Sequence, residues 1–73
     1  MKLTGMENHE FNVMLSYNEL LIIKNALNEI CNGIEVPEFH ARIGASLNEV
    51  QLVLDAIGSI IETAYRARLE DRR

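Results

Sequence analysis

The sequence has little of what usually stabilises a very small protein. Its 73 residues include one cysteine, Cys31, and two histidines, His9 and His40. One cysteine excludes a disulfide within the chain, and these three residues do not have the spacing of a metal-binding motif. We therefore expect no metal site and no cofactor, and we expect Cys31 to be a free, buried thiol.

Long apolar runs are also absent. The longest wholly apolar stretch runs from Leu20 to Ile23, whereas a helix that crosses a bilayer needs about 20 apolar residues. The N-terminal residues lack the basic segment followed by an apolar one that marks a secretion signal. Together with the single thiol, these absences predict a cytoplasmic protein with no membrane contact.

Positive charge is scarce. Seven Lys and Arg residues stand against eleven Asp and Glu, so the net charge is -4 and the pI is near 5.0. Proteins that neutralise phosphates need a concentrated Lys and Arg surface, so this balance disfavours nucleic acid as a partner. The hydrophobic fraction of 48% is nevertheless typical of a chain that folds.

The chain length allows one domain with a marginal core. A monomer of 8.3 kDa is expected to bury about 60% of the surface of its unfolded chain. Burial worth about 25 cal/mol per Å² then nearly cancels an entropy loss of about 1.5 kcal/mol per ordered residue. Because neither a disulfide nor a metal is expected, self-association is the supplement that we predict.

The N-terminal part gives weak structural signals. Residues 1–10 are polar and aperiodic, and we expect them to be frayed. Phe11, Val13 and Leu15 then stand at every second position, as in a short half-buried strand. Two interpretations remain open. We favour an extended lead-in packed on the helices over a strand that pairs with its own copy in a dimer.

Two capping boxes predict the starts of two amphipathic helices. In the first, the Ser16 hydroxyl and the Glu19 carboxylate are spaced to satisfy free N–H groups of a first helical turn. Ser46 and Glu49 repeat the same spacing. Apolar residues at intervals of three and four follow each box and predict helices over about 17–32 and 47–70.

A short helix is expected between these two. Pro37 suits the first turn of a helix and Gly44 suits its end, which predicts a helix over about 37–43. Asn32-Gly33 likewise predicts a left-handed end for the preceding helix. The expected fold class is all-α: a small three-helix domain over 11–73, an orthogonal or helix-turn-helix-like bundle with a long C-terminal helix and a short extended N-terminal lead-in.

The C-terminal helix has more apolar surface than one neighbour needs. At 1.5 Å per residue it would be about 35 Å long, against about 24 Å for the first helix, so its end would overhang. Beside its main apolar face runs a second seam at intervals of four and three, as in a helix with two neighbours. We predict a homodimer that uses this seam, formed by Val53, Ile57, Ile60, Ala64 and Ala67.

The segment from Val36 to Val53 resembles the helix-turn-helix cassette of DNA-binding proteins. Gly44 stands at the turn of the cassette, and its apolar positions hold Phe39, Ile43, Ala45, Val50 and Val53. The resemblance covers about a quarter of the chain. It implies that the second helix enters the major groove, where Asn48 and Gln51 would face the bases.

Two features depart from that cassette. His40 occupies a position usually given to a small residue between the two helices. No Lys or Arg occurs between Arg42 and Arg66, while Glu49 and Asp55 lie on the reading helix, where they would repel phosphates.

The candidate catalytic residues do not form a recognisable site. No nucleophile and no glycine-rich phosphate loop accompanies His40, which we interpret as a surface or packing residue. We therefore expect a small non-enzymatic, self-associating interaction or regulatory module of unknown specific function. The alternative is a helix-turn-helix DNA-binding transcriptional regulator, from which it differs by the missing positive charge.

Overall fold

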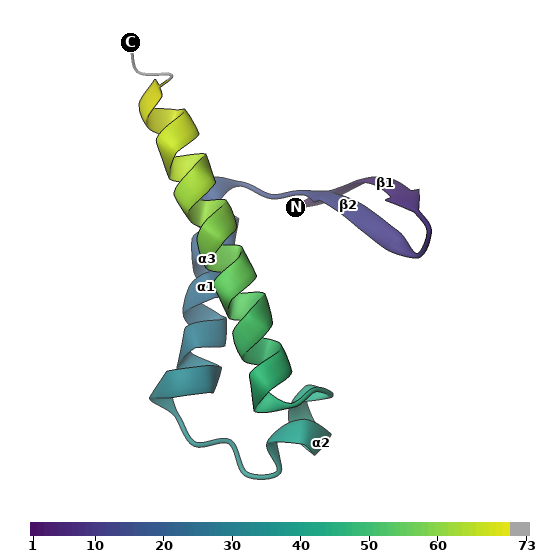
Figure 1. Cartoon of the computed structure of the whole chain (residues 1–73), viewed down its shortest axis with the longest axis vertical. Helices are drawn as coiled ribbons and strands as arrows, with labels where there is room; N and C mark the ends of the chain where they lie inside the picture. The colour runs from purple at the N-terminus through teal and green to yellow at the C-terminus, as the bar shows by residue number, and fades with distance from the viewer. Residues whose placement is uncertain (71–73) are drawn as a thin grey trace.

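The computed structural model consists of a β-hairpin followed by helical elements (Figure 1). It describes residues 1–70, without the side chain of Glu70; residues 71–73 of the expected domain lie outside the described residues. In chain order the elements are β1 (Lys2–Glu7), β2 (Glu10–Met14), α1 (Tyr17–Asn28), the π-helical η1 (Glu29–Gly33), α2 (Phe39–Ile43) and α3 (Leu47–Glu70).

The hairpin corrects the expected fold class. β1 and β2 pair in antiparallel fashion around the two-residue turn Asn8-His9, whose φ angles are 50° and 68°. Positive φ at both positions is the type I′ conformation, which matches the twist of the flanking strands. The all-α prediction is therefore wrong. The extended lead-in is wrong as well, because β2 pairs with β1, in the region where we expected fraying, and the hairpin projects away from the helices (Figure 1).

A bulge interrupts the register of the hairpin. Leu3 pairs with Val13, whereas Met6 pairs with Phe11, so β1 has one extra residue between Leu3 and Gly5. Leu3 and Met6 are three positions apart and would face opposite sides of a regular strand. The bulge returns both to the same side of the hairpin.

α1 and α3 form an antiparallel pair that holds the core (Figure 1). The four buried side chains are Leu20, Val50, Leu54 and Ile61. Both predicted capping boxes are confirmed. The backbone N–H of Glu19 donates to the Ser16 hydroxyl at 3.1 Å, and that of Glu49 donates to the Ser46 hydroxyl at 3.1 Å.

The connection between the paired helices differs in detail from the expectation. α1 continues into η1, in which Asn32 donates a side-chain hydrogen bond to Asn28 at 3.0 Å, and Gly33 does not have the predicted left-handed conformation. Glu38, with φ 52°, precedes α2, so Pro37 lies before the helix instead of in its first turn. Gly44, with φ 84°, ends α2 as predicted.

α2 does not complete a three-helix bundle. It has five residues and lies beyond the end of the α1–α3 pair instead of across it (Figure 1). The Cα radius of gyration is 14.5 Å, against about 11 Å for a compact domain of this length. The chain is therefore an extended molecule with a thin core.

Candidate functional site

The five predicted seam residues lie together on one side of α3, next to the face that packs on α1. We call Val53, Ile57, Ile60, Ala64 and Ala67 the α3 seam. Val53 and Ile60 are 53% and 52% exposed, Ala67 is exposed, and Ile57 and Ala64 are half-buried. The seam is therefore only partly covered by the described part of the chain.

A shallow recess with a mainly apolar surface lies at the edge of the seam. Its lining residues are Ser59, Ile60, Thr63 and Ala64, from two successive turns of α3. The small side chain of Ala64 lies beside Ile60 and leaves this hollow. A helix surface with such a recess can accept an apolar side chain from a partner.

A second apolar surface lies on the hairpin, which the sequence reasoning missed. Because paired residues share a face of a hairpin, as do residues two apart on one strand, Leu3, Met6, Phe11 and Val13 lie on the same side. They are 56%, 69%, 62% and 48% exposed, respectively. We call these four residues the arm face. The opposite side carries Lys2, Gly5, Glu7, Glu10, Asn12 and Met14.

The total exposed surface is large for the mass of the protein. The chain exposes 6093 Å², whereas a compact monomer of 8.3 kDa exposes about 4,600 Å². The excess is about 1,500 Å², and exposed apolar side chains on the hairpin and on α3 contribute to it. A standard interface buries about 800 Å² on each partner.

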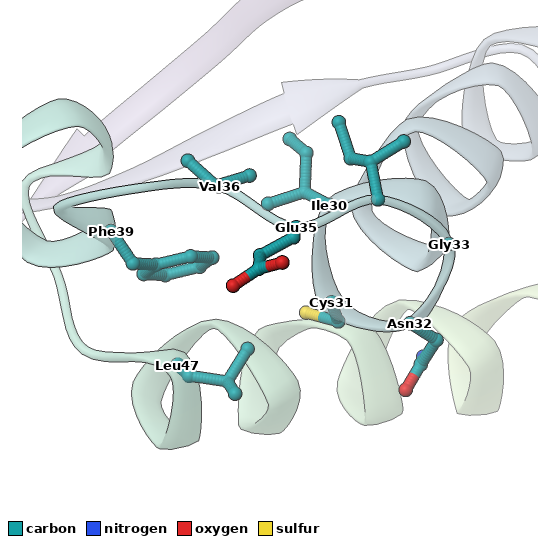
Figure 2. Close-up of a pocket in the computed structure, with 9 residues that line it drawn as sticks. Ile30, Cys31, Asn32, Gly33, Glu35, Val36, Phe39 and Leu47 are labelled. Atoms are coloured by element: carbon teal, nitrogen blue, oxygen red, sulfur yellow. The ribbon is translucent and has the colours of Figure 1, made fainter.

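A pocket lies between η1, the segment that follows it, α2 and the start of α3. Figure 2 shows the ring of Phe39 above Leu47, with the Glu35 carboxylate and the Cys31 sulfur turned toward the same space. The remaining lining is mainly apolar and comes from η1 and the segment that follows it. Cys31 is half-buried, not buried as expected, and no hydrogen bond joins its thiol to the Glu35 carboxylate among the described residues, so we assign no chemistry to the pocket.

The residues of the helix-turn-helix hypothesis lie at the start of α3. Asn48 is exposed, while the Gln51 amide donates to the Asp55 carboxylate at 3.0 Å. Glu49 stands between them, and hydrogen bonds from the backbone and the hydroxyl of Ser46 hold the pKa of Glu49 below its usual value, with a smaller contribution from His40. α2 lies beyond the N-terminal end of α3, so α2 does not cross α3 as the first helix of the cassette would.

The basic residues near the end of α3 are engaged within the chain. Arg66 forms an ion pair with Glu62 at 2.6 Å, one helical turn earlier. The guanidinium of Arg68 lies 5.5 Å from the centre of the Tyr17 ring, which ties the overhanging end of α3 back to α1.

The search for other sites gives little. Within residues 1–70, no three His, Cys, Asp or Glu side chains gather as metal ligands would. None of the described helices is both long and apolar enough to cross a membrane. No protein-family model, no curated protein and no solved structure matches the chain.

Proposed function

We propose that this chain is a non-enzymatic interaction module that works as a homodimer, associating through the α3 seam in the reducing cytoplasm. The observation that carries the proposal is the exposed seam on a chain whose surface exceeds that of a compact monomer by about 1,500 Å². Two copies that bury this excess would form an interface of about 3,000 Å², which is in the range of obligate dimers.

The thin core supports the same proposal. Only four side chains are buried in the described residues, and no disulfide stabilises them. A small domain of this kind usually needs an additional source of stability, and association of apolar surfaces supplies one. The free thiol of Cys31 suits a reducing compartment.

The test is the mass in solution of the wild type and of Ile60→Glu. Ile60 lies in the middle of the seam, where a glutamate would place an unpaired charge in the interface, at a cost of about 3 kcal/mol of association. Sedimentation equilibrium over a range of concentrations should show a dimeric wild type and a dissociation constant raised at least tenfold in the variant.

Leu52→Glu is the matched control. Leu52 is an exposed apolar residue of the same helix, 69% exposed, but it lies outside the seam. We expect this variant to stay dimeric and to keep the helix content of the wild type by circular dichroism. A wild type that stays monomeric at about 100 μM would contradict the proposal, since an obligate interface associates far below that concentration. Loss of the dimer in Leu52→Glu alone would place the interface on another side of α3.

A further inference from the structure

We propose that the hairpin is an arm that two copies exchange: the arm face of one copy docks on the α3 seam of the other, with Phe11 in the recess beside Ala64. The inference rests on the self-association proposed above and names what covers the seam. Its starting point is that one chain carries two separate apolar surfaces, and that both stay largely exposed within the described residues.

The base of the hairpin is attached to α1 at two points. One is the short connection from Met14 to the capping residue Ser16. The other is the Met1 ammonium, which donates to both oxygens of Glu19 at 2.8 Å. Both ends of the hairpin are thus held at the first turn of α1, and the arm points away from its own helices (Figure 1).

This orientation favours a second copy as the occupant. In the structure the arm points away from its own α1–α3 pair, so its apolar face is available to the seam of a neighbouring copy (Figure 1). In a two-fold arrangement each copy donates one arm and receives one, so both apolar surfaces are covered and the assembly closes at two.

The surface area agrees with two copies. The excess of about 1,500 Å² per chain is nearly twice what one partner buries in a standard interface, so one small contact would leave much of it exposed. The arm face and the seam together would contribute apolar residues from the N-terminal and the C-terminal parts of the chain to this interface. The recess is almost entirely apolar, which suits the ring of Phe11.

The first experiment compares Phe11→Glu with Asn12→Glu by sedimentation equilibrium. Phe11 lies on the arm face and the adjacent Asn12 lies on the opposite side, so the two variants place the same charge on opposite faces of the hairpin. We expect Phe11→Glu to raise the dissociation constant at least tenfold and Asn12→Glu to change it less than threefold.

The second experiment is disulfide trapping between chains. In a Cys31→Ser background, Phe11→Cys on a size-tagged chain is mixed with Ala64→Cys on an untagged chain and oxidised. The mixed-size disulfide dimer should form readily, because a disulfide requires Cα atoms within about 7 Å. The control pairs Asn12→Cys with Ala64→Cys and should form little of this product.

The outcomes separate this inference from the proposed function. If Phe11→Glu stays dimeric and no mixed disulfide forms while Ile60→Glu dissociates, arm exchange is wrong and seam association stands. If the wild type is a monomer, both fail. If a chain carrying both Phe11→Cys and Ala64→Cys forms its disulfide internally, the arm folds back on its own helix and the exchange is also wrong.

Discussion

Glu19 connects the base of the hairpin to the start of α1. Its carboxylate accepts a hydrogen bond from the backbone N–H of Ser16 at 2.9 Å and two from the Met1 ammonium. These bonds lower the pKa of Glu19 to about 2 from an ordinary value of 4.5. The Met1 ammonium makes the largest contribution. One side chain thus starts α1 and holds the base of the hairpin.

The lowered pKa predicts a specific acid dependence. A carboxyl group whose pKa falls on folding contributes stability above its unfolded pKa, and this contribution is lost as the pH falls through the folded value. The stability that the Glu19 charge adds should therefore be present above about pH 4.5 and disappear by about pH 2. Urea unfolding of the wild type and Glu19→Gln should differ near neutral pH and converge toward pH 2.

Glu49→Gln is the control for this experiment. Glu49 occupies the same position in the second capping box, but no ammonium group contacts it. Its variant should show a smaller difference from the wild type near neutral pH. An acid profile of Glu19→Gln parallel to that of the wild type would contradict the role given to the Glu19 charge.

Local chemistry made the helices predictable at the level of elements. Each capping box depends on residues three positions apart, so Ser16 and Ser46 predict the helix starts without reference to any tertiary contact. Gly44 likewise predicts the end of α2, because a helix C-cap is also a local feature. The conformation of Gly33 was not predictable in this way, because a π-turn replaced the left-handed ending.

The hairpin was missed for an identifiable reason. A period of two is the sequence signal for a strand, and the bulge places Leu3 and Met6 out of phase. The turn also lacks the glycine that usually marks this type of turn. Asn8 and His9 adopt the positive φ angles instead. Asn8 was the remaining sequence signal for a turn. It is a weak signal unless apolar and polar residues alternate in the segments on both sides of it.

Gly58 gives a prediction at the level of the long helix. α3 continues through this residue without interruption, and a Cβ placed there would meet no atom within 4 Å. Gly58→Ala should therefore stabilise the protein by about 1 kcal/mol through helix propensity alone. Gly44→Ala should do the opposite, by about 1 kcal/mol, because φ at Gly44 is 84°. Urea unfolding of both variants measures the two signs; destabilisation by Gly58→Ala would mean that α3 is kinked or covered there.

At the scale of the whole molecule, the sequence predicted the residues of the α3 seam but not the second apolar surface. The seam follows from helical spacing, which is a local property of α3. The arm face depends on the register of the two strands, and the direction of the hairpin is a property of the tertiary structure. Neither is visible in composition or periodicity.

The stability of the whole molecule should depend on its concentration. If the thin core is completed by a second copy, folding and association are one equilibrium, and mass action favours the native dimer as the chain becomes more concentrated. Thermal unfolding from about 1 to about 100 μM should then show a midpoint that rises by a few degrees per tenfold step. At each concentration Ile60→Glu should unfold at a lower midpoint than the wild type, because its weaker association contributes less stability. A wild-type midpoint that stays constant over the same range would show that the four buried side chains suffice to keep a single chain folded. It would also show that the exposed apolar surfaces do not bind a second copy.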